Sequence, residues 1–164
     1  MATEAPSTSD ALRAAFDRHG ASLFRLCILL TGRRDEAEDL VQESFVRVAS
    51  KVEALAEEAT WPYLRRIALN LWKNRLRRMV IEARARRRGD FGSSSQASSF
   101  EDRDRVWGAV LRLPPRQRAC VVLRYYEDLT ERETAAVLRC SVGTVKSQSA
   151  KALARLREAL GDGD

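Results

Sequence analysis

The chain has 164 residues, of which 45% are hydrophobic and 7% aromatic, with a formal net charge of +6 and an isoelectric point near 9.7. Such a length gives one domain or two small ones. The positive charge indicates a polyanionic partner, either nucleic acid or an anionic membrane. Residues 1–10 have no basic stretch followed by an apolar one, and the longest apolar run, residues 23–30, is interrupted by Arg25. We therefore expect no signal peptide, no membrane span and a cytoplasmic location.

The cysteines are too few and too scattered to indicate a metal site. Cys27, Cys120 and Cys140 form no CxxC pair, and His19 is the single histidine. A structural zinc site needs thiolate and imidazole ligands at closer spacing. We expect three buried or half-buried thiols in a reducing compartment, and neither a metal nor another cofactor.

Hydrophobic residues recur at helical spacing in almost every segment, and no segment alternates with a period of two, so the predicted fold is all-α. The first helix should begin after Ser9 and Asp10, be interrupted at Gly20 and end at Gly32. Its apolar residues are Leu12, Ala15, Phe16, Leu23, Phe24, Cys27, Ile28 and Leu30.

A second helix should begin at Asp35, with Glu38 completing a capping box. Its predicted core face consists of Ala37, Val41, Phe45, Val48 and Val52. A separate stripe should face outward and consists of Asp39, Gln42, Glu43 and Val46.

A third helix should follow a loop over residues 53–60, with Pro62 in its first turn, and run to about Arg88. Its predicted buried residues are Leu64, Ile67, Ala68, Leu71 and Met79. Between Pro62 and Arg88 the chain carries ten Arg or Lys residues and one acid, Glu82, so the other face of this helix is basic.

Residues 89–99 are rich in Gly and Ser, as flexible linkers are. We therefore predict two small helical domains, residues 8–88 and 102–161, joined by a flexible linker over residues 89–101. The second domain should open with a short helix bearing Val106, Trp107, Val110, Leu111 and Leu113. A break at Pro114 and Pro115 leads to a helix that bears Ala119, Val122, Leu123 and Tyr126 and ends near Asp128.

The last third of the chain has the pattern of a helix-turn-helix. Thr130 and Glu133 form a second capping-box pattern, residues 139–141 a short turn, and Ser141 a cap for the final helix. One face of that helix is apolar: Val142, Val145, Ala152, Leu153, Leu156 and Leu160. The opposite face is small, polar and cationic: Gly143, Thr144, Ser147, Ala150, Lys151 and Ala154, flanked by Lys146 and Gln148.

Residues 139–157 contain five basic residues and no acid, as a helix in the major groove requires. A helical hairpin with a solvated basic face is the simpler alternative. The caps, the turn and the charge bias together favour DNA binding.

Three motifs, in this order, resemble those of the extracytoplasmic-function (ECF) group of bacterial sigma factors. They are DEAEDLVQESFVRV at residues 35–48, YLRRIALN with NRLRR at residues 63–78, and LTERETAAVL with VGTVKS at residues 129–147. The resemblance extends over roughly residues 12–160. It implies an alternative sigma factor that binds core RNA polymerase and promoter DNA, with no catalytic residue, cofactor or small-molecule substrate. Family members are often held by an anti-sigma factor, which is a further candidate partner.

The resemblance also implies a role for each exposed stripe. The first motif is similar to the helix that grips the polymerase clamp, so the expected polymerase-binding residues are Asp39, Gln42, Glu43 and Val46. The second is similar to the helix that reads the −10 element, with expected contacts from Arg65, Arg66, Asn70, Lys73, Asn74, Arg77 and Arg78. The third is similar to the helix-turn-helix that reads the −35 element, with expected contacts from Arg139, Ser141, Gly143, Thr144, Lys146, Ser147, Gln148 and Lys151. By the same analogy, the loop over residues 53–60 helps to hold a flipped base.

Two departures from the family pattern leave alternatives open. Tyr63 stands where Trp is usual, with Trp61 two residues earlier, so Trp61, Tyr63 and Trp72 are candidates either for base stacking or for the core. Gln148 follows Lys146 and Ser147 where many members carry Arg. Because Gln reads adenine and Arg reads guanine or phosphate, this indicates an altered −35 preference or an actinobacterial, SigE-like subgroup.

Two other classes of function compete. A stand-alone helix-turn-helix regulator would need a dimerisation or effector surface in the N-terminal half, whereas that half has an acidic stripe followed by a basic helix, which suits two different partners. An enzyme acting on nucleic acid would need clustered carboxylates or a nucleophile with its base. The acids of residues 35–43 follow a helix surface instead, and His19 has no evident catalytic partner.

Overall fold

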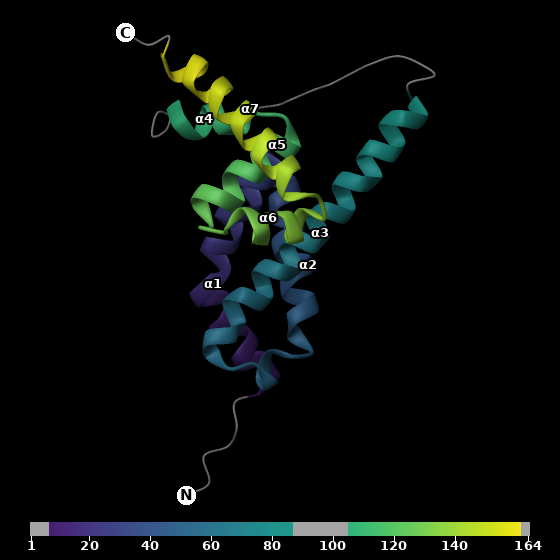
Figure 1. Ribbon diagram of the computed structural model, residues 1–164. Coiled ribbons are helices and arrows are strands. Elements are labelled where there is room, and N and C mark those ends of the chain that lie inside the picture. Colours follow the sequence, from purple (N-terminus) through teal and green to yellow (C-terminus); the bar gives the residue numbers. More distant parts are fainter. Residues whose placement is uncertain (1–6, 87–104, 162–164) are drawn as a thin grey trace, which may run out of the picture. The chain divides into compact units, whose positions relative to one another are not determined.

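A computed structural model of the chain describes residues 7–86 and 105–161 (Figure 1). Every regular element in these two ranges is a helix, as the all-α prediction requires. The described residues divide into two compact units, residues 7–27 with 35–86 (unit 1) and residues 28–34 with 105–161 (unit 2). The predicted linker, residues 89–101, lies outside the described ranges.

Unit 1 is built from α1 (Thr8–Thr31, except its last turn), α2 (Arg34–Ala49), η1 (Val52–Ala54) and α3 (Glu57–Arg86). The predicted core face of the second helix is confirmed, since its residues are buried, although Val52 lies in η1 and not in α2. The other large buried side chains are Leu23 and Leu26 of α1, Leu40 of α2, and Leu64, Leu69, Leu71 and Trp72 of α3. Across α1 and α2, the rings of Phe16 and Phe45 lie 5.1 Å apart between centroids.

The predicted interruption at Gly20 is wrong, because α1 continues through it. The ring of Phe16 covers this glycine, and a Cβ placed there would lie 3.5 Å from that ring. A glycine inside a helix costs about 1 kcal/mol relative to alanine, which the buried surroundings offset. Gly32 does end α1 as predicted, with a φ of 71° that favours glycine.

The predicted loop over residues 53–60 is too long. The chain forms η1 and then begins α3 at Glu57, so that Pro62 is the sixth residue of α3 and not in its first turn. Proline is tolerated here because it removes only the bond to the carbonyl of Glu58, and both residues are exposed to water. The acids Glu57 and Glu58 in the first turn suit the positive end of the helix dipole.

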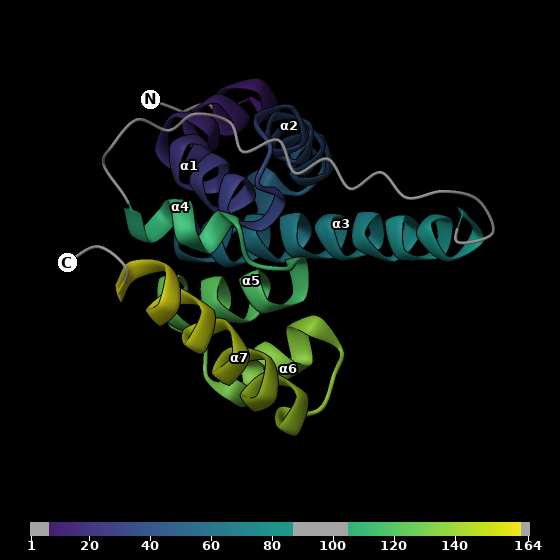
Figure 2. The same cartoon turned by 90° about the horizontal axis from the view of Figure 1, so that it is seen from above.

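Met79 was predicted to be buried, and this is wrong because the side chain is exposed. The C-terminal half of α3 extends beyond α1 and α2 (Figures 1 and 2). Helical spacing alone cannot indicate where the neighbouring helices end, and beyond that point an apolar residue has nothing to pack against.

Unit 2 contains α4 (Arg105–Leu111), α5 (Pro115–Val121), η2 (Val122–Tyr126), α6 (Glu131–Leu138) and α7 (Val142–Gly161). Figure 2 shows α5, α6 and α7 side by side. Cys120, Ala135 and Val145 form a core shared by these three helices. The other buried residues of unit 2 include Ala119, Ala152 and Leu156, and Val122 and Leu123 of η2. Pro115 begins α5, as predicted. Val142 was assigned to the apolar face of α7, but it is exposed in the first turn of that helix, so this assignment is wrong.

The residues after α5 form a π-helical turn, η2, which the sequence pattern did not indicate. It is closed by hydrogen bonds from the amide of Glu127 to the carbonyl of Val122 and from the amide of Leu129 to the carbonyl of Leu123. In this turn the ring of Tyr126 meets that of Trp107 of α4 edge to face, at 5.6 Å between centroids. Asp128, with a φ of 55°, then turns the chain toward α6.

Within unit 2, the buried guanidinium of Arg118 of α5 donates hydrogen bonds to backbone carbonyls at the C-terminal ends of two helices. It donates to the carbonyl oxygens of Leu30 and Thr31 in residues 28–34 and to that of Leu111 at the end of α4. Helix C-termini carry unsatisfied carbonyls and partial negative charge, so a cation is favoured there.

The predicted burial of the cysteines is confirmed, since Cys27 and Cys120 are buried and Cys140 is half-buried. Burial raises the pKa of the Cys27 thiol to about 12 and that of the Cys120 thiol to about 11. Both thiols are therefore protonated and poorly nucleophilic near neutral pH.

Candidate functional site

The outward stripe of α2 is the first of three exposed polar faces. Asp39, Gln42 and Val46 are exposed, and the exposed fraction of Val46, an apolar residue, is 73%. Glu43 is half-buried, because it pairs with Nη2 of Arg47 at 2.8 Å and with Nη2 of Arg75 in α3 at 3.3 Å. Arg75 also donates to the carbonyl of Glu36. Glu43 therefore joins α2 to α3, whereas the other three residues are available to a partner.

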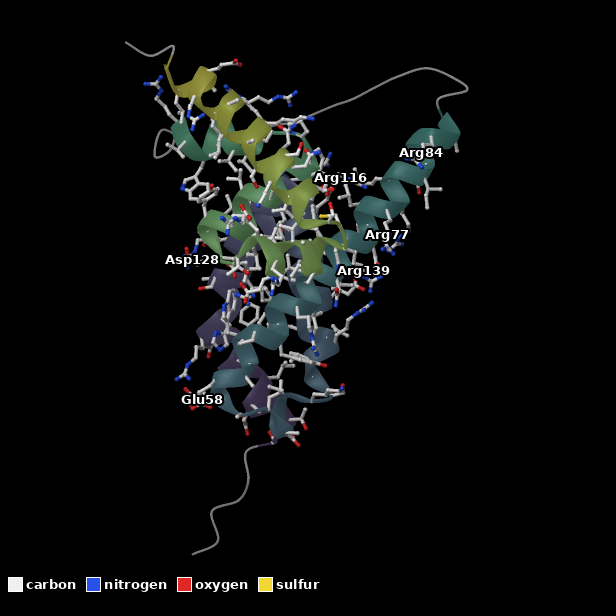
Figure 3. The ribbon with its side chains drawn as sticks, viewed as in Figure 1. Glu58, Arg77, Arg84, Arg116, Asp128 and Arg139 are labelled. Carbon is white, nitrogen blue, oxygen red and sulfur yellow. The ribbon has the colours of Figure 1, made fainter. Side chains whose placement is uncertain are left out.

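The second face is a cationic stripe along α3. Arg66, Asn70, Lys73 and Arg77 follow one another at spacings of three or four residues, so they share one side of the helix. Asn74 is exposed beside this stripe, whereas the exposed Arg78 and the half-buried Arg65 lie further round the helix, on opposite sides of the stripe. The structure therefore brings four of the seven residues expected to bind −10 DNA into one line. Arg84 continues that line seven residues beyond Arg77 (Figure 3).

The three aromatic candidates of this region differ in burial. Trp72 is only 5% exposed and belongs to the core of unit 1, which leaves no free ring face for a base. Trp61 is half-buried, with the ring of His19 at 5.9 Å between centroids. Tyr63 is half-buried and lies 5.2 Å from the guanidinium carbon of Arg66, a cation–π distance that links it to the cationic stripe.

The third face belongs to the helix-turn-helix formed by α6 and α7, and the local signals predicted its geometry correctly. The hydroxyl of Thr130 accepts from the amide of Glu133 at 3.2 Å, and the Glu133 carboxylate accepts from the amide of Thr130 at 2.7 Å. Arg139 ends α6 with a left-handed φ of 51° (Figure 3). The hydroxyl of Ser141 then caps α7 by accepting from the amide of Thr144 at 3.0 Å.

The exposed side of α7 has small residues in its middle and polar ones at its edges. Gly143, Ser147 and Lys151 are exposed at intervals of four residues. Lys146 is exposed on one flank, and Gln148 and Thr144 are half-buried on the other. Arg139 and Ser141 are exposed in the turn that precedes this helix. All eight residues expected to bind −35 DNA therefore lie on or beside one surface of the helix-turn-helix.

Two features of these faces were not assigned from the sequence. Arg84 was counted among the basic residues but not placed in a stripe, although its spacing from Arg77 could have indicated it. Glu131 of α6 lies near Lys146 of α7, with Oε2 and Nζ 3.8 Å apart. No local pattern predicts that pair, because it depends on how α6 and α7 pack.

Within residues 7–86 and 105–161, no three His, Cys, Asp or Glu side chains lie together as metal ligands would. In the same ranges, no helix combines the length and the apolar character that crossing a membrane requires.

Both halves of the chain match families of known proteins. Residues 15–79 match the family described as Sigma-70 region 2, and residues 103–156 match Sigma-70, region 4. The RNA polymerase sigma-E factor of Streptomyces antibioticus is 37% identical over 130 residues, which span 76% of this chain and 71% of that protein. The ECF RNA polymerase sigma factor SigM of Mycobacterium tuberculosis is 33% identical over 156 residues, spanning 91% of this chain and 79% of that protein.

Two solved structures share the fold. The sigma factor RpoE of Bartonella quintana, in complex with the anti-sigma factor NepR, has a TM-score of 0.64 at 24% identity and covers 93% of this chain and 98% of that one. CnrH, in complex with the cytosolic domain of CnrY, has a TM-score of 0.54 at 24% identity and covers 96% of both chains.

Proposed function

The chain belongs to the extracytoplasmic-function (ECF) group of bacterial RNA polymerase sigma factors, and we propose that each of its three exposed faces performs one step of promoter recognition. It is an alternative sigma factor with relatives among the sigma-E factors of actinobacteria. The presence of region 2 before region 4 in one chain carries this conclusion, because a stand-alone regulator has no use for region 2.

We propose that the N-terminal sigma domain comprises residues 8–88 and the C-terminal one residues 102–161, joined by a linker over residues 89–101. The matched ranges, residues 15–79 and 103–156, support these boundaries. The protein acts as a specificity subunit and not as an enzyme, and it works where core polymerase is, in the cytoplasm. An anti-sigma factor is a further proposed partner, because the similar sigma factor RpoE was solved in complex with the anti-sigma factor NepR.

Core polymerase should bind the α2 face through Asp39, Gln42 and Val46. An exposed valine among polar groups suits an interface in which apolar contact supplies affinity and charge sets the register. Glu43, which this proposal also includes, acts by holding Arg75 of α3, so that α2 stays fixed on α3.

The cationic stripe of α3 should bind the −10 region as it opens. Its residues are Arg66, Asn70, Lys73 and Arg77, with Asn74 beside them and with Arg78 and Arg65 further round the helix on either side. A single strand can be followed by a row of cations that contact phosphates, with aromatic side chains that stack on its bases. Tyr63, held beside Arg66, is the aromatic side chain best placed for that stacking, and Trp72 is not a candidate.

The exposed side of α7 should enter the major groove of the −35 element. Gly143 and Ser147 allow the helix backbone to approach closely, and Arg139, Lys146 and Lys151 supply phosphate contacts. Ser141 and Thr144 hold the helix start, and their hydroxyls lie 2.9 Å apart. Gln148 is the residue most suited to base reading. Changing Gln148→Arg should shift the preferred base at one −35 position from adenine toward guanine.

Transcription with purified components tests the whole proposal. The protein is mixed with core RNA polymerase and a promoter library, and the transcripts are sequenced. We expect initiation at a defined set of promoters that share −35 and −10 elements. Sequence-specific duplex binding without any polymerase-dependent transcript would instead favour a stand-alone regulator.

Variants of α2 test the polymerase face separately. Asp39→Ala with Gln42→Ala should weaken binding to core polymerase while the unfolding temperature stays unchanged. Asp17→Ala is the matched control, because it removes an exposed acid of α1 outside this face. Equal binding by the α2 variant and the control would contradict the assignment.

A further inference from the structure

The carboxylate of Glu131 lies between two cations from different elements. Its Oε1 is 3.9 Å from Nη2 of Arg124 in η2, and its Oε2 is 3.8 Å from Nζ of Lys146 in α7. The Lys146 side chain is 64% exposed, whereas that of Glu131 is 37% exposed. The acid is therefore the more firmly placed partner of this pair, and the lysine is the one that remains accessible to a ligand.

Arg124 determines where that carboxylate lies. Its Nη1 donates to the carbonyl of Leu129 at 2.9 Å, and its guanidinium carbon lies 5.8 Å from the centroid of the Tyr125 ring. Arg124 is thus held at two points besides its contact with Glu131. The carboxylate is positioned by this anchored cation and presents its second oxygen to Lys146.

The start of α6 does not require the Glu131 carboxylate. The capping box is completed by the side chains of Thr130 and Glu133. Glu131 follows the cap in the first turn, where an acid interacts favourably with the helix dipole wherever its side chain points. Its approach to Lys146 therefore needs a separate explanation.

Lys146 lies on the flank of the face that should meet DNA. Residues 139–157 supply five basic side chains and no acid of their own, so α6 brings a negative charge to a helix that otherwise lacks one there. A lysine that binds a phosphate must exchange this carboxylate for it, and the phosphate must then lie near an uncompensated negative charge. Both effects oppose binding to any sequence, because phosphates carry no sequence information.

We propose that Glu131 limits the affinity of α7 for duplex DNA by holding the ammonium group of Lys146. The inference rests on the proposed role of Lys146 in binding −35 DNA. Because Lys146 is held in this way, the helix-turn-helix alone binds duplex DNA weakly. Stable promoter binding then depends on the other contacts of the sigma factor and on polymerase. Glu131 is then a positioning residue, which acts through Lys146 and not on DNA directly.

The test measures binding of the full chain to a short labelled duplex of mixed sequence, by fluorescence anisotropy over a series of KCl concentrations. Glu131→Gln should tighten binding roughly two- to five-fold at low salt, the factor that an exposed ion pair corresponds to. The slope of log affinity against log salt should steepen by up to roughly 0.9, the contribution of one phosphate contact. Lys146→Gln should weaken binding and flatten that slope.

Two further variants test whether Glu131 changes DNA affinity through Lys146. In the double variant Glu131→Gln with Lys146→Gln, the gain from removing the acid should disappear. Glu131→Asp keeps the charge at the start of α6 but withdraws the carboxylate by one methylene, so it should show much of the gain. Glu158→Gln is the matched control, since it removes an exposed acid from the end of α7. It should leave affinity nearly unchanged.

Three results would overturn the inference: no gain with Glu131→Gln, the same gain in the Lys146→Gln background, or an equal gain with Glu158→Gln. If Lys146→Gln alone has no effect on binding, the role of Lys146 in the proposed function has failed, and the inference fails with it. If Lys146→Gln weakens binding but Glu131→Gln changes nothing, the proposed function stands and only the inference fails.

Discussion

The two helices expected to meet DNA, α3 in unit 1 and α7 in unit 2, have opposite kinds of exposed surface. Along α3 the exposed positions carry long side chains, such as Arg66 and Arg77, above a buried face that contains Trp72. In the first two turns of α7 the centre of the exposed side carries the short residues Gly143 and Ser147, with the longer Lys146 on its flank. Long cations can follow a flexible backbone at many angles, whereas short residues let a helix axis approach a groove. The contrast favours single-stranded DNA for α3 and duplex for α7.

The largest expected effect is a loss of stability on changing the buried face of α3, which has no counterpart on its exposed stripe. Trp72→Ala should lower the free energy of unfolding by about 3–5 kcal/mol, because it leaves a large cavity in the core of unit 1. Urea unfolding followed by far-ultraviolet circular dichroism measures this. Arg66→Ala is the control on the exposed stripe, with an expected change within about 0.5 kcal/mol.

The same pair of variants separates core packing from base stacking. Arg66→Ala should weaken binding to single-stranded −10 DNA although the protein remains stable. If Trp72→Ala instead left stability unchanged and lost only DNA binding, the ring would belong to the DNA-binding surface and its burial would have no structural role.

The next effect concerns how closely α7 can approach the major groove of the −35 duplex. Gly143→Leu should weaken binding to −35 duplex roughly ten- to hundred-fold, about the loss of one good base contact of 1–3 kcal/mol. An added Cβ meets only the Ser141 hydroxyl oxygen at 3.7 Å, so the folded protein accommodates it. Stability should rise by about 0.5–1 kcal/mol, because most residues favour a helix more than glycine does.

Gly108→Ala is the matched control for that variant. Gly108 lies in α4, and a Cβ there would meet nothing within 4 Å. The control should gain stability in the same way without any change in DNA binding. Equal DNA binding by Gly143→Leu and wild type would mean that this part of α7 does not enter the groove.

The two helices also differ in how much of their structure could be predicted from the sequence. At α6 and α7 the caps are local, so Thr130, Glu133 and Ser141 predicted both helix starts correctly. The start of α3 was misplaced because Pro62 is tolerated in the sixth position, which depends on exposure and not on a local motif. The exposure of Met79 and the approach of Glu131 to Lys146 depend on where neighbouring helices end or pack. The spacing of residues along the sequence indicates neither the exposure of a helix position nor the packing of neighbouring helices.

A smaller effect tests how much the local cap contributes to the helix-turn-helix. Thr130→Ala should lower the free energy of unfolding by about 1 kcal/mol, the usual cost of losing an N-cap hydroxyl. Thr130→Ser keeps the hydroxyl that accepts from the amide of Glu133 and should lose much less. Thermal unfolding followed by circular dichroism compares the two. Equal losses would assign the effect to the lost methyl group and not to the cap.

The smallest expected effect is a pH dependence confined to unit 1, beside the start of α3. Burial next to Trp61, and secondly the positive charge of Arg18, lower the pKa of His19 from its usual 6.5. As the pH falls below that value, the unfolded chain takes up a proton before the folded one does, so this contribution to stability is present above pH 6.5 and declines on acidification.

Because His19 is the single histidine, one imidazole Hε1 resonance reports its titration by nuclear magnetic resonance. The midpoint in the folded protein should lie below the midpoint in urea. His19→Gln should remove the corresponding part of the fall in stability between neutral and mildly acidic pH. A folded midpoint above the unfolded one would reverse the sign, since stability would then increase on acidification, and His19 would have to be interacting with a negative charge instead of packing on Trp61.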